Sequence, residues 1–461
     1  MSIANLKKIH FIGIGGIGVS AIARMMLKKG KEVSGSDYTA SELIQQLEQL
    51  GARVYIGHDG NNLNSDTDLV IYSAAIEPEN PERIRATELE IQQLSYGEFL
   101  GKYSRNKKTI AIAGTNGKTT TTAILGQVLV DCGLDPTVVV GSQLKLFGGN
   151  YREGNSEYFV LEADEYKANM LNVEPWTIML TSIEEDHLDF YHNLDDIINH
   201  FQMFVEKQPV NGYIFYNADD PNIKRLEFRH HFFGCSITGR SDYWIKNYSL
   251  SLGNARFSVY FRNDFLEEFC LRIPGDYNVL NSLMVIGLCH QLMVDMKKVK
   301  ESLENFNGLW RRFELVGTYQ KAEDVQVISD YTHHPDAIKK TLKAARSFYP
   351  NRRLFLVYQP HQHHRTKALF DQFVTCFGEA DFLILSEIYD VAGRKSTADS
   401  DVSSKDLMKA IIKKCLKPKN KIYFAKDLRK TKKLIAKYIK PGDLLIIMGA
   451  GDIDKVAREI I

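Results

Sequence analysis

The sequence predicts an α/β protein of three domains, each built on a mainly parallel sheet. Short apolar runs, such as residues 9–15 and 68–75, alternate with amphipathic stretches along most of the chain. This alternation is typical of strands connected by helices. Two glycine-rich segments, 13–18 and 114–117, each stand between an apolar run and a helical pattern. The length of 461 residues corresponds to two to four domains of about 100–200 residues each.

The order of these patterns divides the chain into three domains. The first spans residues 1–103, and the polar run KYSRNKK, residues 102–108, is interpreted as a linker. The second spans 104–312 and includes an alternating stretch near 243–273 that suggests a small antiparallel element. The third spans 313–461, where strand-like runs again alternate with helical patterns.

Composition narrows the class of protein. Hydrophobic residues make up 44% and charged residues 25%, as in soluble globular proteins. The 58 Lys and Arg residues balance 57 Asp and Glu residues, which argues against general nucleic-acid binding. The N-terminus enters a strand directly, no apolar run is long enough to span a membrane, and the six scattered cysteines form no CxxC pair. We therefore expect a cytoplasmic protein with free thiols and no membrane insertion.

The first glycine loop has the pattern G-x-G-x-x-G. Its glycines allow a tight turn and let backbone N–H groups approach a diphosphate at a helix N-terminus. Asp37 ends the next apolar run, where an acid can hold a ribose hydroxyl. Any nucleotide diphosphate satisfies this chemistry, so a dehydrogenase that binds NAD and a ligand-free turn both stay open.

The second loop, GTNGKTT, begins at Gly114. Lys118 can neutralise the charge of the β- and γ-phosphates, and the Thr119 hydroxyl can bind Mg²⁺. A full Walker pattern would need glycine where Ile112 stands. The flanking strand and helix patterns nevertheless predict ATP as the ligand.

Acidic side chains follow two apolar runs of the second domain. Glu162, Asp164 and Glu165 come after the first run, and Glu185, Asp186 and His187 come after the second. Parallel sheets bind ligands at the carboxyl ends of their strands, and carboxylate oxygens suit Mg²⁺. Two such clusters downstream of a phosphate loop favour a metal site.

Several motifs together resemble one family, the Mur ligases, which build the peptide of the bacterial cell wall. They are GTNGKTT, EADE at 162–165, DH at 186–187, NADDP at 217–221, PGDYNVLNSL at 274–283 and WRRFE at 310–314, in the family's order and over nearly the whole chain. The resemblance implies a Rossmann-like first domain that binds a UDP-sugar, a central P-loop ATPase-like domain that binds ATP, and a C-terminal Rossmann-like domain that binds an amino acid.

Within the family, residues 10–23, 330–338, 359–366 and 448–453 resemble the branch that joins L-alanine to the lactoyl carboxylate of UDP-N-acetylmuramate. The implied reaction uses ATP and Mg²⁺ and passes through an acyl phosphate. Asn116 and Tyr166 depart from that branch, and Tyr166 leans toward a recycling branch that attaches a whole tripeptide. A non-catalytic ATP-binding switch is a further alternative, and the sequence leaves the oligomeric state open.

The resemblance also implies roles for individual residues. The ATP site is expected to contain Gly114, Thr115, Asn116, Gly117, Lys118, Thr119, Thr120, Asn278, Arg312 and Asp330. The UDP-sugar site is expected to contain Gly13, Gly15, Gly16, Gly18, Ser36, Asp37 and Ser73. Tyr331, His333, His361 and Arg365 are expected to place the amino acid, and Thr119, Glu162 and His187 to bind metal. The expected catalytic residues are Lys118, His187, His333 and Arg365; His363, His364 and Arg394 receive no role.

In the third domain, three apolar runs end in polar residues. These runs are 325–331, 353–360 and 443–451. Parallel strands carry their ligand-binding residues at one edge of the sheet. We therefore expect Asp330, the segment from His361 to Arg365, and the segment from Gly449 to Asp452 to share one edge, which closes onto the ATP site about a hinge near WRRFEL.

Overall fold

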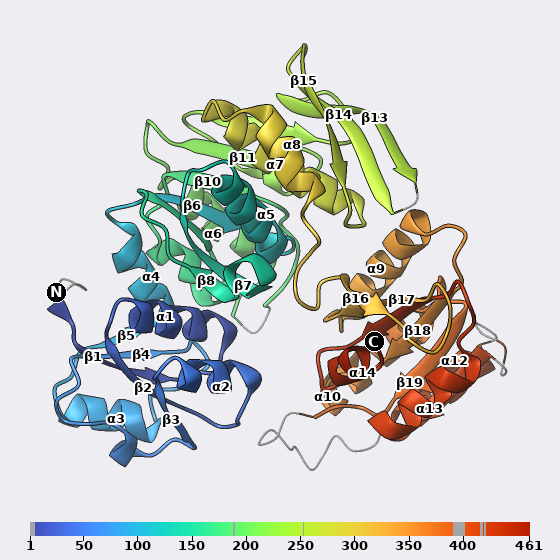
Figure 1. The fold of residues 1–461 in the computed structure, drawn as a ribbon. Helices are drawn as coiled ribbons and strands as arrows, with labels where there is room; N and C mark the ends of the chain where they lie inside the picture. Colours follow the sequence, from blue (N-terminus) through green and yellow to red (C-terminus); the bar gives the residue numbers. More distant parts are fainter. Residues whose placement is uncertain (1–4, 188–189, 252, 391–401, 415–417, 419–420) are drawn as a thin grey trace. The chain divides into compact units, whose positions relative to one another are not determined.

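The structure is a computed structural model, and it describes residues 5–187, 190–251, 253–390, 402–414, 418 and 421–461. Its strands form three sheets (Figure 1). The chain divides into two compact units. The first unit comprises Met1–Asn247, Phe257–Phe269 and Tyr277–Glu304, and the second comprises Tyr248–Arg256, Cys270–Asp276 and Asn305–Ile461.

The first sheet has five parallel strands in the order β3-β2-β1-β4-β5. Its strands are β1 (Lys8–Ile12), β2 (Glu32–Asp37), β3 (Arg53–Ile56), β4 (Leu69–Tyr72) and β5 (Gln93–Ser95). They alternate with α1 (Ile17–Lys28), α2 (Glu42–Gln49), the short 3₁₀ helix η2 (Gly60–Asn62) and α3 (Pro81–Glu88). The chain leaves β1 for β2 on one side and later returns to β4 on the other. The first glycine loop follows β1 and thus lies at the switch point where such sheets bind ligands.

Helix α4 (Tyr96–Ser104) connects the first sheet to the next. The predicted linker at 102–108 is therefore wrong in part, because the helix continues to Ser104 and the following strand begins at Lys108. A capping box between Ser95 and Glu98 starts the helix, and Phe99 and Leu100 are buried. Capping and apolar burial outweigh the polar character of the run, which had suggested a linker.

The second sheet has ten strands in the order β15-β14-β13-β12-β11-β10-β6-β9-β7-β8. They are β6 (Lys108–Ala113), β7 (Thr137–Leu144), β8 (Gly149–Arg152), β9 (Tyr158–Glu162), β10 (Thr177–Leu180), β11 (Tyr213–Asn217), β12 (Phe232–Ser236), β13 (Tyr243–Ser251), β14 (Asn254–Phe261) and β15 (Asp264–Leu271). Strands β14 and β15 are hydrogen-bonded neighbours joined by two residues, so they form an antiparallel hairpin, as expected. Strand β6 pairs in parallel with β9 and β10, which brings the carboxyl ends of these three strands together.

Helices and short 3₁₀ turns connect several strands of this second sheet, and two further helices, α7 (Asp276–Gln291) and α8 (Met296–Glu304), follow its last strand. The connecting helices are α5 (Lys118–Asp131) and α6 (Leu194–Val205), and the 3₁₀ turns are η3 (Lys145–Phe147), η4 (Tyr166–Asn172) and η5 (Ile223–Arg225). Helix α5 starts directly after the second glycine loop, which gives the expected strand–loop–helix order.

The third sheet has six strands in the order β16-β17-β21-β18-β19-β20. They are β16 (Glu314–Thr318), β17 (Gln326–Asp330), β18 (Leu354–Tyr358), β19 (Phe382–Ser386), β20 (Ile422–Ala425) and β21 (Leu444–Met448). All pairings are parallel except that of β16 with β17. The helices are α9 (Pro335–Phe348), α10 (His363–Ala368), α11 (Phe370–Thr375), α12 (Ser404–Lys413), α13 (Leu428–Tyr438) and α14 (Asp454–Glu459). The expected edge is confirmed, because β17, β21 and β18 are parallel neighbours and end side by side.

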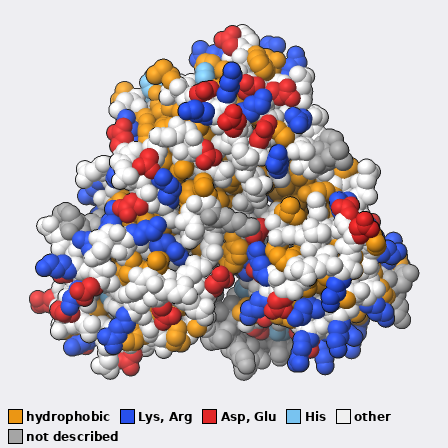
Figure 2. Space-filling model, in the orientation of Figure 1, with side chains coloured by type: hydrophobic (Ala, Val, Ile, Leu, Met, Phe, Trp, Pro, Cys, Tyr) orange, Lys and Arg blue, Asp and Glu red, His pale blue; other side chains and the backbone are white. Residues whose placement is uncertain are grey.

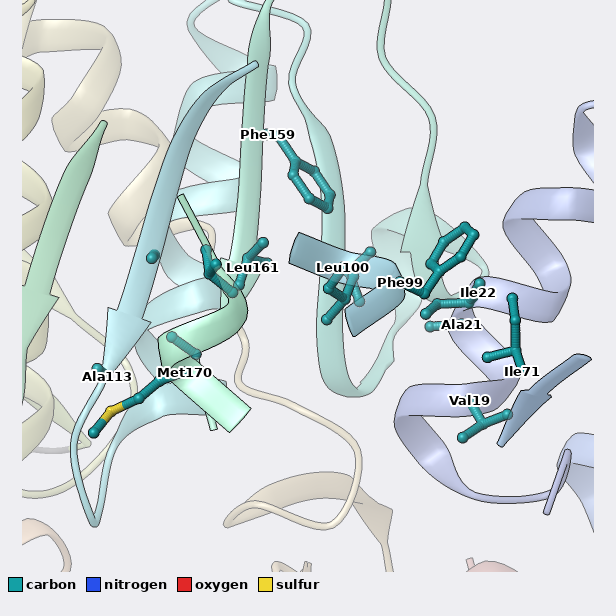
Figure 3. Packing of buried hydrophobic residues seen from close by; sticks show 14 of the residues in the cluster. Val19, Ala21, Ile22, Ile71, Phe99, Leu100, Ala113, Phe159, Leu161 and Met170 are labelled. Carbon is teal, nitrogen blue, oxygen red and sulfur yellow. The ribbon is translucent and has the colours of Figure 1, made fainter. Parts of the chain in front are cut away.

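A single apolar core joins the first two sheets within the first unit. In Figure 3 the side chains of Phe99 and Leu100 from α4 lie between Ile22 of α1 and Phe159 and Leu161 of the second sheet. All five side chains are buried. Apolar burial stabilises a fold by about 25 cal/mol per Å², so this shared core ties the two glycine loops to one body.

The surface carries charges of both signs (Figure 2), and Lys and Arg side chains gather over α12 and α13. In α13 the exposed residues include Arg429, Lys430 and Lys433, whereas Leu434 and Ile435 are buried. This division is typical of a helix with one solvated face. Among the described residues, no helix combines the length and the apolar character that crossing a bilayer requires.

Candidate active site

The first glycine loop is held by the end of β2. The backbone N–H groups of Gly13 and Ile14 donate to the Ser36 carbonyl over 2.9 and 3.0 Å. The N–H of Gly15 donates to Asp37 Oδ2 over 2.9 Å. Gly13 has a φ of +79°, and a Cβ added there would lie 3.0 Å from the Cβ of Ser73. The structure thus brings Gly13, Gly15, Ser36, Asp37 and Ser73 together, and their role in binding a sugar nucleotide stays a prediction.

The rest of this loop leads into helix α1. Gly16 is the residue before the helix, and its N–H donates to the Gly13 carbonyl over 3.1 Å. Gly18 lies in the first turn, where an added Cβ would lie 2.8 Å from the Tyr96 ring. A side chain at either position would hinder the approach of a ligand to the helix N-terminus, where free N–H groups and the helix dipole favour an anion.

A buried carboxylate beneath the loop was missed by sequence reasoning. Glu82 is fully buried and accepts hydrogen bonds from His10 Nε2 (3.1 Å), Ser36 Oγ (2.6 Å), the Asp59 N–H (3.2 Å) and Asn62 Nδ2 (2.7 Å). Burial by itself would raise the pKa of this carboxyl, but the bonds from His10, Ser36 and Asn62 outweigh burial and lower the pKa. Glu82 therefore stays ionised and holds Ser36, which in turn carries the glycine loop.

The second glycine loop is held by the two residues that follow β10, Thr181 and Ser182. Gly114 has a φ of +133°, and an added Cβ would overlap the Thr181 hydroxyl. The Thr115 N–H donates to the Ser182 carbonyl over 2.8 Å, and the Asn116 N–H donates to Ser182 Oγ over 3.0 Å. Gly117 precedes α5 with a φ of +90°, and Thr120 lies in the first turn of that helix. The loop is thus preformed at a helix N-terminus, the geometry that binds phosphates.

Lys118 points back into this loop. Its ammonium donates to the Gly114 carbonyl over 2.6 Å and to Glu165 Oε2 over 2.7 Å. Burial works to lower the pKa of Lys118, but the carboxylates of Glu165 and Asp164 outweigh burial and raise it. Lys118 is therefore a fixed positive charge beside the loop. Sequence reasoning found Glu165 as one acid of a cluster, but not as the partner of Lys118.

Two of the three predicted metal ligands lie side by side. Thr119 Oγ1 donates to Glu162 Oε2 over 3.0 Å, and the Gly141 N–H donates to the other oxygen of Glu162. A hydroxyl and a carboxylate at a phosphate loop are suited to Mg²⁺, a hard cation that also takes water and phosphate oxygens. Among the described residues, no three His, Cys, Asp or Glu side chains are arranged to hold a metal ion.

The third predicted ligand, His187, is placed near Glu165. Its Nε2 lies 3.8 Å from Glu165 Oε1, and its ring centroid lies 4.8 Å from that of Tyr166. His187 has a φ of +54°, an uncommon backbone conformation for a residue with a side chain. The structure therefore brings His187 to the Lys118–Glu165 pair, and its role as a metal ligand stays a prediction.

Helix α7 contributes two asparagines to the second loop region. Asn278 is 6% exposed and lies near the start of the helix. Asn281 follows three residues later on the same face, and its amide would lie 3.2–3.3 Å from a Cβ added at Gly117. Asn281 Nδ2 is buried with no hydrogen-bond partner among the described residues. Sequence reasoning missed Asn281, although the N-x-x-N spacing already places it beside Asn278.

At the edge of the third sheet, Asp330 organises the chain around it. Its two carboxylate oxygens accept from the Phe313 and Thr332 N–H groups, each over 2.7 Å. Arg311, which sequence reasoning missed, is 8% exposed, and its guanidinium donates to the carbonyls of Gly449 and Gly451. The predicted Arg312 stands next to it, with its guanidinium carbon 5.8 Å from the centre of the Tyr331 ring.

The predicted amino-acid residues lie close to one another at this edge. The Tyr331 and His333 rings are 5.5 Å apart, and the His333 and His361 rings are 5.9 Å apart. Arg365 donates from Nη1 to His361 Nδ1 over 3.1 Å. Burial lowers the pKa of both histidines to about 4, with a smaller contribution from the Arg365 charge. Both imidazoles are thus neutral at pH 7.

The remaining residues of the HQHH segment differ in environment. His363 Nδ1 pairs with Asp390 Oδ2 at 2.5 Å, so His363 is tied to the loop after β19. His364 is exposed. Arg394 lies outside the described residues.

Family models match most of the chain. The model described as Mur ligase family, catalytic domain, matches residues 8–108. The Mur ligase middle domain matches residues 112–289, and the Mur ligase, glutamate ligase domain, matches residues 311–451.

Curated relatives match over nearly the full length. A UDP-N-acetylmuramate–L-alanine ligase of Clostridium novyi (strain NT) is 42% identical over 459 residues, which cover 98% of this chain and 97% of that relative. A protein of the same name from Sulfurihydrogenibium sp. (strain YO3AOP1) is 39% identical over 456 residues, which cover 98% and 96%.

Solved structures of Mur ligases have a similar fold. The UDP-N-acetylmuramate–alanine ligase of Thermotoga maritima has a TM-score of 0.84 at 29% identity and covers 98% of each chain. A murein peptide ligase from Psychrobacter arcticus 273-4 has a TM-score of 0.70 at 24% identity, which shows the fold alone. The predictions of a three-domain α/β architecture and of the ligase class are confirmed, and the chain belongs to the Mur ligase family.

Proposed function

We propose that the protein joins L-alanine to the lactoyl carboxylate of UDP-N-acetylmuramate with ATP as the energy source. The observation that carries this proposal is the identity of 42% to a ligase of that name, over 98% of this chain. The first glycine loop binds the UDP-sugar and the second binds ATP. Because one apolar core joins the first two sheets, the two proposed nucleotide sites are held in a fixed position relative to each other.

The chemistry requires a carboxylate and a triphosphate to meet, although both are anions. Transfer of the γ-phosphoryl group of ATP to the carboxylate breaks the bond to ADP and gives an acyl phosphate. The amine then attacks the carbonyl and loses a proton, and phosphate leaves as the amide forms. Lys118, held protonated by Glu165, supplies positive charge where the transferring phosphoryl group lies. The contacts of Lys118 with the Gly114 carbonyl and Glu165 are exchanged for phosphate contacts when ATP binds.

Thr119 and Glu162 are the residues that would hold Mg²⁺ at the ATP phosphates. Their oxygens already lie 3.0 Å apart, and the Gly141 N–H fixes the carboxylate. When bound, the ion would supply charge neutralisation for the phosphates. His187, beside Glu165, is proposed to serve a second ion.

The amino acid is proposed to bind at the edge of the third sheet. Arg365 can grip its carboxylate as a two-pronged donor. His333 Nδ1 donates to the Tyr331 carbonyl over 3.1 Å, which leaves Nε2 as an acceptor for the amino group. Because the pKa of His333 is about 4, this side chain orients the amine and is a weak proton acceptor. A cytoplasmic location is proposed, in keeping with the free cysteines of the described chain.

The decisive experiment measures phosphate release with ATP and UDP-N-acetylmuramate, tested across L-alanine, glycine, L-serine and the tripeptide that a recycling ligase would attach. We expect release with L-alanine and none without the sugar nucleotide. Release with the tripeptide alone would instead assign the protein to the recycling branch, as Tyr166 suggests. ATP hydrolysis that does not depend on the sugar nucleotide would contradict both assignments.

A further inference from the structure

Helix α4 packs through two glycines against η4, the segment that follows the acidic residues of the proposed ATP site. Gly97 and Gly101 are four residues apart and lie on one face of the helix. A Cβ at Gly97 would lie 2.7 Å from Asn169 Oδ1, and a Cβ at Gly101 would overlap the Asn172 carbonyl. Both asparagines belong to η4, which begins directly after Glu165. Because no side chain separates them, the helix and this segment are held at a fixed distance.

The same helix starts at the first glycine loop. Tyr96 is its first residue, and a Cβ at Gly18 would lie 2.8 Å from the ring and 3.0 Å from the hydroxyl oxygen. The absence of a side chain at Gly18 therefore makes room for the phenol. The Tyr96 hydroxyl thus lies over the last glycine of the loop that is proposed to bind the UDP-sugar.

A second contact joins the same two regions. Lys167 of η4 donates from Nζ to the Ala74 carbonyl over 3.1 Å. Ala74 follows Ser73, one of the predicted UDP-sugar residues. Tyr96 and η4 therefore both contact the region of the first glycine loop, and we take them as the two boundaries of the space between the loops.

The electrostatic surroundings keep the Tyr96 phenol neutral. Burial is the largest cause, and the nearby carboxylates of Glu162 and Asp164 add to it, so the pKa of Tyr96 is raised far above the usual value. A neutral phenol is a hydrogen-bond donor. Within the described part of the chain, the Tyr96 hydroxyl has no protein hydrogen-bond partner. The donor is therefore available to a ligand.

We propose that Tyr96 is a positioning residue whose hydroxyl donates a hydrogen bond to the lactoyl carboxylate of the sugar nucleotide. This proposal rests on the proposed function. The lactoyl carboxylate has to reach from the first loop toward the γ-phosphate, and that path passes the Glu162 and Asp164 carboxylates, which repel it. A neutral donor at Tyr96 holds the carboxylate in place at a point where the surrounding charges are unfavourable.

The test compares Tyr96→Phe with the wild-type chain by calorimetry, using UDP-N-acetylmuramate and UDP-N-acetylglucosamine, which lacks the lactoyl group. A hydrogen bond to a charged group contributes about 1.5–3 kcal/mol, which corresponds to a factor of about 10–100 in affinity. We expect Tyr96→Phe to weaken UDP-N-acetylmuramate binding by about 10-fold or more. Binding of UDP-N-acetylglucosamine and ATP should change less than about 2-fold, since neither ligand meets the phenol.

Tyr103→Phe is the matched control, because Tyr103 is on the same helix and packs against Phe99 and Phe159. This variant should bind both sugar nucleotides as the wild type does. Equal losses for both sugar nucleotides in Tyr96→Phe would place the phenol at the diphosphate and overturn the proposal, as would unchanged affinity for both. The proposed function is tested separately with the wild-type chain. If the wild type releases no phosphate with UDP-N-acetylmuramate and L-alanine, the proposed function is wrong, whatever the result for Tyr96→Phe.

Discussion

Lys118 and Glu165 form an ion pair at the second glycine loop, with 2.7 Å between Nζ and Oε2. The side chain of Glu165 is 3% exposed, so the pair lies where water screens charge weakly. Lys118, which is proposed to bind the phosphates of ATP, is thus held protonated and in place. Replacement of this lysine should affect the chemical step far more than the folding of the first sheet.

Lys118→Ala is expected to abolish ligation and to leave UDP-sugar binding nearly unchanged. Loss of one positive charge at the transferring phosphoryl group costs several kcal/mol of transition-state stabilisation. Phosphate release measures the first effect, and calorimetry with UDP-N-acetylmuramate measures the second. A parallel loss of sugar-nucleotide affinity would show that the two loops do not act as separate sites.

His187→Ala is expected to raise the Mg²⁺ concentration needed for half-maximal activity, with ATP affinity less affected. The reason is the position of His187 beside Glu165, at 3.8 Å, at the ATP site. A titration of activity with Mg²⁺ measures the change. His192→Ala is a suitable control, because His192 is exposed and lies beyond this cluster in the chain. A Mg²⁺ dependence identical to that of the wild type would rule out the ligand role.

Arg365→Ala is expected to raise the KM for L-alanine, with much smaller effects on the KM for ATP and for UDP-N-acetylmuramate. When the bound carboxylate loses the two hydrogen bonds from the guanidinium, the binding free energy weakens by about 2–4 kcal/mol. Steady-state kinetics with each substrate varied in turn separates the three constants. If the KM for L-alanine were unchanged while affinity for the sugar nucleotide fell, this edge of the third sheet would not be the amino-acid site.

Acidification is expected to destabilise the protein through His333 and His361. Burial lowers their folded-state pKa to about 4, below the unfolded value of about 6.5. Between these values the unfolded chain binds more protons than the folded chain, so stability falls as the pH drops from about 6.5 toward about 4. Thermal unfolding of the full chain at several pH values measures this. His333→Asn combined with His361→Asn should flatten the dependence, whereas His364→Asn, at an exposed position, should not.

Glu82→Ala is expected to lower the free energy of unfolding by about 3–5 kcal/mol, since removal of one member of a buried polar cluster leaves its partners unpaired. His10 and Asn62 lose a hydrogen-bond partner in this variant. Denaturant unfolding gives the change, and Glu88→Ala on the same helix, at an exposed site, is the control. Glu82→Ala should also weaken UDP-sugar binding, because Ser36 loses the partner that holds it beneath the glycine loop.

Much of the fold could be predicted from the sequence because its signals are local. Apolar runs such as those of β1 and β21 are buried strands, and each glycine loop lies between a strand and a helix. The linker at 102–108 was misjudged because its polar residues gave no sign of the capping box that starts α4 seven residues earlier. The exact limits of the three domains stay predictions.

Site residues within motifs could be named, but their partners in distant parts of the chain could not. His10 and Glu82 are 72 positions apart, and Arg311 and Gly449 are 138 positions apart. Neither Glu82 nor Arg311 belongs to a local pattern that marks a buried charge. The role that we propose for Tyr96 could not be predicted either. It depends on Gly18 and on carboxylates that only the folded chain brings near the phenol.

The carboxylate of Asp330 that binds the Phe313 and Thr332 N–H groups has a consequence for domain motion. The chain entering the third sheet is fastened there, and Arg311 fastens it a second time to the Gly449 and Gly451 carbonyls. Any rotation of this sheet therefore carries residues 311–313 with it, and the pivot has to precede them. A spectroscopic label on the third sheet would consequently report the motion of residues 311–313 as well, so it could test whether the closure that we expect takes place.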